Sequence, residues 1–180
     1  MDNIISLKIT QDEDEAYISL PAETLDFSKA TAIQITDCVC PMLKGMDIND
    51  VDISALNNFA VQLQQINDIG KLPKLNAVLS ANQCNSVNQA ILLAERLEHF
   101  NLDAKIKDYA DLVYDELENV IGGKQAEELR QCLDIEKYGR ILQQGYNAVF
   151  TEYGMVTRDD FQPMDATWQN ESEVMDMQIT

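Results

Sequence analysis

Residues 52–66 have the sequence DISALNNFAVQLQQI, and the hydrophobic pattern of the chain changes at this segment. Within it, apolar residues recur at intervals of three and four, which places them on one face of a helix. These residues are Leu56, Phe59, Ala60, Leu63 and Ile66. Either Asp52 or Ser54 can cap the first turn, because both side chains accept hydrogen bonds from helix N–H groups. The segment therefore predicts the first helix of a helical middle region.

The residues before this segment predict an antiparallel sheet. In residues 4–10 every second residue is apolar, which is typical of a half-buried strand. A polar turn at residues 11–14 separates it from a second predicted strand, residues 16–20, so we expect a hairpin. Residues 32–36 alternate in the same way and predict a third strand, and a helical turn is expected over residues 22–27.

The residues after this segment predict five more helices and two closing strands. Pro73 suits the first turn of the second helix, and Ser86, Asp108 and Asp134 are the expected N-caps of the third, fourth and sixth helices. The fourth helix is expected to end at Gly122-Gly123, the fifth covers residues 125–133, and the sixth covers residues 135–143 and ends at Gly145. The closing strands are residues 148–151 and 153–157.

This order of elements predicts an α+β chain of three small consecutive domains. The predicted units are an N-terminal β-rich domain (1–51), a central helical domain (52–102), a C-terminal α+β domain (103–157) and an acidic tail (158–180).

The charge of the chain excludes several classes of function. The 180 residues include 31 Asp and Glu against 13 Lys and Arg, a net charge of −18 at pH 7. Proteins that bind nucleic acid directly need clustered Lys and Arg, so we expect no direct nucleic-acid binding. Successive thirds of the chain hold 11, 9 and 11 acidic residues against 3, 5 and 5 basic ones. Every third is acidic, whereas a solvated tail would concentrate the excess at one end.

The sequence also contains no membrane-spanning run and no secretory signal, so we expect a cytoplasmic protein with no membrane partner and reduced thiols. Cys38 and Cys40 are expected to share one face at the end of a strand. A zinc site needs a second pair of ligands, and Cys84, Cys132 and His99 are isolated from one another, so no metal site is predicted.

Enzymatic activity is not expected. The sequence lacks a glycine-rich phosphate loop and a Gly-x-Ser-x-Gly motif, and His99, the single histidine, has no Ser or Cys partner nearby in the sequence. We therefore predict neither catalytic residues nor a cofactor.

The fourth predicted helix carries an unusual row of acidic residues. At about 100° per residue, four carboxylates fall within roughly 80° of one another. They are Asp108, Asp111, Asp115 and Glu118, and no Lys or Arg lies between Lys107 and Lys124. Stabilisation by the helix N-terminus accounts for the first two but not for the last two. The row is either a solvated face or a functional surface.

The spacing of these carboxylates suggests what they could imitate. Neighbours three or four residues apart on a helix lie about 5–6 Å apart at Cβ, which is similar to the separation of successive phosphates in a nucleic-acid strand. A duplex carries about one charge per 1.7 Å, so 31 carboxylates match roughly 53 Å of DNA. A compact globule of this length is only about 40 Å across. Mimicry of DNA therefore requires an elongated monomer, an end-to-end dimer, or both.

Several segments, in this order, resemble the ArdA antirestriction family over about residues 15–157. They are DCVCP (37–41), DISALNNFA (52–60), DYADL (108–112), DIEKYGR (134–140) and FTEYGMV (150–156). The N-terminal sheet departs from the family pattern at residues 33–38, IQITDC, and the residues after Arg158 have no counterpart in it.

The resemblance implies an elongated, curved homodimer that imitates bent B-form DNA and occupies the DNA groove of Type I restriction-modification enzymes. Its partners would be the methyltransferase and specificity subunits of such enzymes, in bacterial hosts of mobile genetic elements. The family's antirestriction motif resembles residues 126–140, which adds further carboxylates to the acidic surface. These are Glu127, Glu128, Asp134 and Glu136. Tyr138 and Tyr153 are the expected dimer contacts.

Two alternatives remain open from the sequence. The same mimicry could be directed at another nucleic-acid-binding defence system, such as a CRISPR effector. An acidic adaptor, in which the charge only maintains solubility, is the third hypothesis and belongs to a different class.

Overall fold

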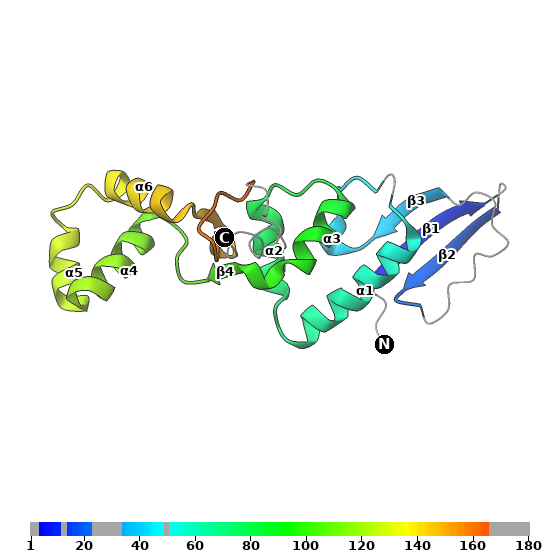
Figure 1. Ribbon diagram of the computed structural model, residues 1–180, viewed down its shortest axis with the longest axis horizontal. Helices are drawn as coiled ribbons and strands as arrows, with labels where there is room; N and C mark the ends of the chain where they lie inside the picture. The colour runs from blue at the N-terminus through cyan, green and yellow to red at the C-terminus, as the bar shows by residue number, and fades with distance from the viewer. Residues whose placement is uncertain (1–3, 12–13, 23–33, 49–50, 166–180) are drawn as a thin grey trace, which may run out of the picture.

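The structure is a computed structural model that describes residues 4–11, 14–22, 34–48 and 51–165 of the chain. The fold is α+β, as the sequence predicts. In Figure 1 the elements follow one another along the longest axis, with a three-stranded sheet at one end and a group of three helices at the other. The predicted helical turn at residues 22–27 lies almost wholly outside the described residues.

The N-terminal sheet has the strand order β2-β1-β3, and both pairs are antiparallel. Its strands are β1 (Ile5–Gln11), β2 (Asp14–Leu20) and β3 (Gln34–Val39). Ile5, Leu7 and Ile9 point into the core, which confirms the predicted alternation. The described part of the third strand runs from Gln34 to Val39, three residues beyond the predicted end, and residues 32–33 of the prediction lie outside the described residues. As a result, Cys38 and the buried Cys40 both contact the core, as expected for one shared face.

Three helices form the middle of the molecule, and their first turns are those predicted. They are α1 (Ile53–Asp68), α2 (Leu72–Ala81) and α3 (Val87–Glu95). Asp52, rather than Ser54, caps α1, because its carboxylate accepts a hydrogen bond from the Ser54 N–H at 3.1 Å. Ser86 caps α3 by accepting from the Gln89 N–H at 3.3 Å.

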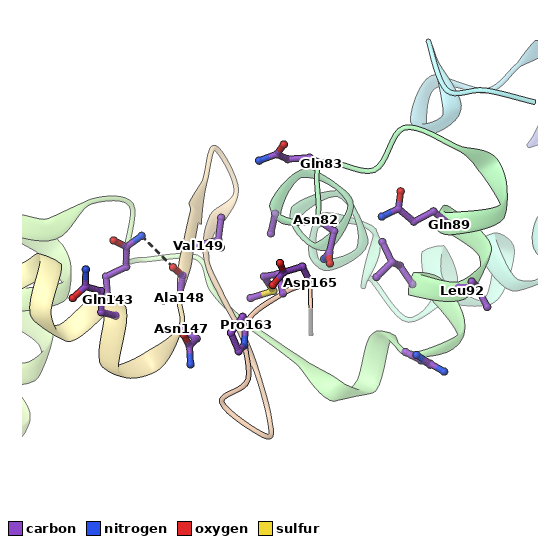
Figure 2. Close-up of a pocket in the computed structure, with 15 residues that line it drawn as sticks. Asn82, Gln83, Gln89, Leu92, Gln143, Asn147, Ala148, Val149, Pro163 and Asp165 are labelled. Atoms are coloured by element: carbon purple, nitrogen blue, oxygen red, sulfur yellow. Dashed lines mark hydrogen bonds between the residues drawn. The ribbon is translucent and has the colours of Figure 1, made fainter. Parts of the chain in front are cut away.

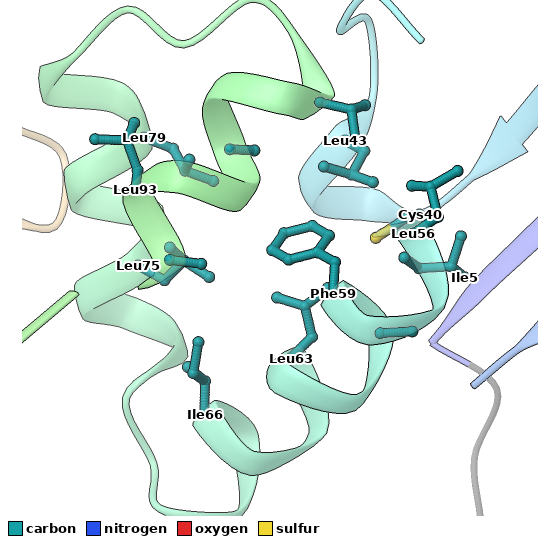
Figure 3. Packing of buried hydrophobic residues seen from close by; sticks show 14 of the residues in the cluster. Ile5, Cys40, Leu43, Leu56, Phe59, Leu63, Ile66, Leu75, Leu79 and Leu93 are labelled. Carbon is teal, nitrogen blue, oxygen red and sulfur yellow. The ribbon is translucent and has the colours of Figure 1, made fainter. Parts of the chain in front are cut away.

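One hydrophobic cluster unites the N-terminal sheet with these helices. Figure 3 shows Phe59 of α1 at its centre, between Leu43 and Leu75, with Ile5 of β1 nearby. Phe59 is 1% exposed, so α1 buries the face that its three- and four-residue spacing predicts.

A second small sheet closes the middle region, and one of its strands was not predicted. The sheet has the order β4-β6-β5 and consists of β4 (Phe100–Asp103), β5 (Val149–Thr151) and β6 (Gly154–Arg158). The strand β4 is four residues long and pairs with β6, which lies more than 50 residues away in the sequence. A segment this short has no periodic pattern of apolar residues from which it could be predicted. Phe100 and Val156 both enter the central cluster. The closing strands therefore complete the core of the middle helices.

The remaining helices form a separate, smaller cluster. They are α4 (Tyr109–Ile121), α5 (Gly123–Arg130) and α6 (Ile135–Tyr146). Its buried residues are Val113, Leu117 and Ala126. The predicted end of α6 at Gly145 is wrong, because the helix continues to Tyr146 and Asn147 ends it in the left-handed conformation, with φ of 48°. The helix α5 starts two residues earlier than predicted and stops at Arg130.

Tyr109, the first residue of α4, connects the three-helix unit to the strand β5. Its ring packs edge-on against Phe150 of β5, with 5.4 Å between the ring centroids. Its hydroxyl donates to the side chain of Gln143, which in turn donates to the Ala148 carbonyl. Gly139 of α6 lies directly on Tyr109, since a Cβ added there would be 2.6 Å from the Tyr109 Cβ.

The residue at the predicted start of the tail is anchored in the fold. Arg158 ends β6 and is fully buried, and its guanidinium donates to Asp160 at 2.6 and 2.9 Å and to the Pro163 carbonyl at 3.2 Å. The bonds from Arg158 lower the pKa of the Asp160 carboxyl below its ordinary value.

We predict that Gly139→Ala destabilises the protein by about 1–3 kcal/mol, because the new methyl group overlaps Tyr109. Gly145→Ala, in the same helix, is the matched control. Nothing lies within 4 Å of its added Cβ, so the better helix propensity should stabilise the protein by about 0.5–1 kcal/mol. Urea unfolding of both variants measures the difference, and equal effects would contradict the close contact.

We also predict that Asp160→Asn lowers the free energy of unfolding by about 1–2 kcal/mol at neutral pH, because the buried Arg158 loses its charged partner. The effect is no larger because Asp160 is partly exposed to solvent, which weakens the ion pair. Because the folded pKa of Asp160 is lowered, its contribution is complete above the ordinary value of 3.8 and disappears as the pH falls through the folded value. Unfolding curves measured from pH 7 downward should therefore converge for the two proteins. A constant difference at all pH values would exclude this linkage.

Candidate functional site

The first two acidic residues of α4 bind backbone groups. The Asp108 carboxylate accepts from the N–H groups of Ala110 and Asp111, at 2.8 and 3.0 Å, which confirms it as the N-cap. Asp111 accepts from the Lys107 N–H at 2.9 Å, one residue before the position expected for a capping box. Both carboxylates therefore stabilise the start of the helix in addition to carrying charge.

The next two acidic residues have no such role. Asp115 is half-buried and accepts from the side-chain amide of Asn119 at 3.1 Å, and Glu118 is exposed. Together with Asp111 they occupy positions i, i+4 and i+7 of one continuous helix. Among the described residues, no Lys, Arg or His forms an ion pair with any of the four acidic residues of the predicted row. We call these four residues, Asp108, Asp111, Asp115 and Glu118, the α4 acidic row.

The opposite side of α4 is only partly as predicted. Val113 and Leu117 are buried in the small cluster, and Leu112 is buried as well. Val120, which the helical period assigns to the apolar side, is 71% exposed. The helical period alone therefore does not reveal which apolar residues of α4 are buried.

Glu116, which was not among the predicted site residues, attaches α4 to α6. Its carboxylate accepts a hydrogen bond from the Tyr146 hydroxyl at 2.8 Å, and this bond raises the pKa of Tyr146 above its ordinary value. The two residues are 30 positions apart, so no local signal marks the contact. Glu116 therefore acts as a structural link between the helices.

Two of the four carboxylates predicted in residues 126–140 have an arginine beside them, unlike those of the α4 acidic row. Glu127 lies 4.0 Å from Arg130, and Glu136 pairs with Arg140 at 2.8 Å. Asp134 caps α6 by accepting from the Lys137 N–H at 3.0 Å. Glu128 is exposed beside them. These four carboxylates thus lie on the same three-helix unit as α4. Two of them, Glu127 and Glu136, have their negative charge offset by a nearby arginine.

The two tyrosines expected at a dimer contact lie in different parts of the fold. Tyr138 packs against the small cluster of α4–α6, whereas Tyr153 packs against the central cluster. Exposed apolar side chains on the three-helix unit are a surface signal that the sequence analysis missed. They are Val120, Ile121, Leu129 and Ile141. Ile141, 57% exposed, borders a hollow of about 350 Å³ together with Lys137, Arg140 and neighbouring residues of α6.

Two basic side chains of the middle region, Lys71 and His99, lie beside carboxylates. Lys71 binds Glu98 at 2.6 Å, which lowers the pKa of Glu98, and burial lowers the pKa of Lys74. The Nδ1 atom of His99 lies 2.9 Å from the Asp159 carboxylate. The charge of this region is therefore partly paired, in contrast to the α4 acidic row.

Two further observations bear on other functions. Burial raises the pKa of the Cys38 thiol to about 11, so it is a poor nucleophile at neutral pH. Over the ranges that the structure describes, no group of three or more His, Cys, Asp or Glu is arranged to hold a metal ion. Within the same ranges, each helix is too short or too polar to cross a lipid bilayer.

Comparison with known families identifies the chain. The comparison with curated proteins gives no match. The family model of the antirestriction protein (ArdA) matches residues 9–157, which is more than four fifths of the sequence. The match includes β2, β3, the α-helices α1–α6 of the described residues and the α4 acidic row. The chain therefore belongs to the ArdA family of antirestriction proteins, which are non-enzymatic inhibitors of restriction systems.

Proposed function

We propose that this protein inhibits Type I restriction-modification enzymes by placing its acidic surface in their DNA-binding groove, where it replaces B-form DNA. The observation that carries the proposal is the α4 acidic row, in which four carboxylates share one helix without an ion-pair partner among the described residues. Their positions on the helix give separations of about 5–6 Å between Cβ atoms, similar to the separation of backbone phosphates.

Electrostatics explains why such a row would compete with DNA. Like charges three or four residues apart destabilise a helix by about 0.2–0.5 kcal/mol per pair. A groove lined with Lys and Arg relieves this repulsion on binding, so the attraction is strong and long-ranged. The α4 acidic row therefore gains more electrostatic binding energy from a basic partner than carboxylates that already have a cation beside them would gain.

The shape of the molecule supports the same function. The described elements extend along one axis in Figure 1, and the α4–α6 unit occupies one end. An extended body can follow a DNA groove over a greater length than a sphere of the same mass. We propose that the chain acts as three consecutive units, 1–51, 52–102 and 103–157, and that a homodimer extends the acidic surface further.

The dimer contact is proposed on the three-helix unit. Tyr138 lies there, beside the exposed Ile141 of the same helix. Tyr153 is also in residues 103–157, but it packs against the central hydrophobic cluster instead of the three-helix unit. The partner subunits are proposed to be the methyltransferase and specificity subunits, in the cytoplasm of a bacterial host.

We predict that reversing two charges of the α4 acidic row, Asp115→Lys with Glu118→Lys, weakens inhibition of a Type I enzyme by about tenfold or more, since each lost charge contact is worth roughly 1 kcal/mol. These two residues are not N-caps. The change converts the repulsion between Asp111 and residue 115 into attraction and leaves a like-charge pair at 115 and 118, so the free energy of unfolding should change little. Methylation assays with titrated inhibitor measure the first effect, and urea unfolding measures the second.

The matched control is Asp68→Lys with Glu95→Lys, which makes the same change in net charge on exposed positions of α1 and α3. It should leave inhibition nearly unchanged. An equal loss in both double variants would mean that total charge, and not the α4 acidic row, determines binding. Full activity of the α4 variant would favour the acidic adaptor.

We also predict that the affinity for the target falls by about tenfold or more between roughly 50 and 200 mM salt, and that duplex DNA displaces the protein. Titration calorimetry at several salt concentrations, with and without duplex, measures both effects. A ternary complex of enzyme, duplex and inhibitor would contradict competition for one groove. Parallel assays with a CRISPR effector would show whether the same surface serves another defence system.

A further inference from the structure

The chain crosses twice between the three-helix unit and the rest of the molecule. One crossing is the linker of residues 104–108, between β4 and α4, and the other joins α6 to β5 at residues 147–148. Figure 2 shows the second crossing, where the side chain of Gln143 donates to the Ala148 carbonyl at 3.1 Å. The linker leads directly into the α4 acidic row, so its course sets the direction in which α4 leaves the second sheet.

The linker is bound to its surroundings along most of its length. The Lys105 N–H donates to the Asp103 carboxylate, and the Lys107 N–H donates to the Asp111 carboxylate, both at 2.9 Å. Ile106 is 3% exposed, although it belongs to neither of the two hydrophobic clusters. The linker is therefore an ordered part of the fold and not a loose tether.

The turn between β5 and β6, residues 151–154, packs directly on this linker. A Cβ added to Gly154 would lie 2.7 Å from the Cα of Ala104, so the two backbones are in contact, and the φ of Gly154 is 139°, which favours glycine. The Thr151 hydroxyl donates to the Gly154 carbonyl at 2.8 Å and accepts from the Tyr153 N–H at 3.2 Å. The turn therefore offers the linker a surface that its own hydrogen bonds hold in shape.

Lys107 attaches the linker to this turn. Its ammonium group donates to the Glu152 carbonyl, 45 positions away in the sequence. Lys107 is also the residue next to Asp108, yet among the described residues no ion pair joins it to Asp108 or Asp111. The cation nearest to the α4 acidic row in the sequence thus binds a backbone carbonyl of another element.

We propose that Lys107 is a positioning residue for the α4 acidic row. Its bond to the β5–β6 turn holds the linker, and with it the first turn of α4, at one angle to the second sheet. The same bond keeps its positive charge from pairing with Asp108 and Asp111, so the row stays available to a basic partner. The consequence for inhibition rests on the proposed function, because a surface that is already oriented loses less entropy when it binds.

Lys107→Met tests the proposal because charge and positioning predict opposite results. The variant is more negative by one charge, so attraction to a basic groove alone would leave inhibition equal or stronger. Loss of positioning should instead weaken inhibition of a Type I enzyme by about threefold to tenfold, since the less ordered unit loses more entropy on binding. Methylation assays with titrated inhibitor measure the effect.

Two further variants serve as controls. Lys105→Met removes the same charge from an exposed position of the same linker and should not weaken inhibition. Lys107→Arg keeps a cationic donor for the Glu152 carbonyl and should inhibit as the unchanged protein does. Rescue by arginine but not by methionine would assign the effect to the donated hydrogen bond.

A distance measurement separates the orientation of the three-helix unit from its activity. Double electron–electron resonance uses one spin label on the exposed Cys132, between α5 and α6, and a second on the cysteine introduced by Ser80→Cys at an exposed position of α2. Cys38→Ala and Cys84→Ala remove the two half-buried thiols. Dilution with unlabelled protein suppresses distances between copies.

We expect the distance distribution to broaden about twofold in Lys107→Met, because the unit then samples more orientations. It should stay unchanged in Lys105→Met and in Lys107→Arg. An unchanged distribution in Lys107→Met would overturn the positioning role. Broadening without any loss of inhibition would overturn it as well, since the angle would then not matter for binding.

The same data distinguish this inference from the proposed function. If the unchanged protein did not inhibit Type I enzymes but the distribution still broadened in Lys107→Met, the proposed function would fail and the hold of Lys107 on the linker would stand. Far-UV circular dichroism checks that each variant is folded. Lys107→Gln, which is shorter and uncharged, replaces the methionine variant if that variant does not fold.

Discussion

The concentration of negative charge on one helix is the constraint on which the rest of this structure depends. Asp111, Asp115 and Glu118 repel one another along α4, and no Lys or Arg occurs within that helix to offset them. The helix is held instead by apolar packing and by contacts at its ends. Val113 and Leu117 bury its inner face, and the Asp108 cap satisfies its first N–H groups.

The packing around α4 is small and therefore depends on close contacts. The cluster beneath it has three buried residues, compared with the much larger central cluster. Gly139 allows α6 to approach Tyr109 directly, and the Glu116–Tyr146 hydrogen bond joins the same two helices farther along. These contacts join α4 to α6 and so hold α4, which carries the acidic row, against its neighbour.

The division of the fold into two hydrophobic clusters has a functional consequence. The N-terminal sheet, the middle helices and the second sheet share one core, whereas α4–α6 have their own. The orientation of the acidic unit therefore depends on few groups, chiefly Tyr109 with Phe150 and Gln143 with Ala148.

Local features of the fold could be predicted from the sequence, because they depend on neighbours in the chain. The period of apolar residues predicts β1 and α1, and short polar side chains predict the caps at Ser86, Asp108 and Asp134. The absence of cations between Lys107 and Lys124 predicts the α4 acidic row, and segments in family order predict the ArdA family, which the family comparison confirms.

The tertiary structure alone decides what depends on contacts between distant residues. The strand β4 forms because β6 supplies its partner, and it carries Phe100 into the central cluster. Val120 is exposed although the helical period places it on the apolar side of α4. The sequence alone determined how much negative charge the protein carries and on which helix it gathers, since both follow from residue order. The fold decided which carboxylates have cations beside them and which remain for a basic partner, since ion pairing depends on distances in space.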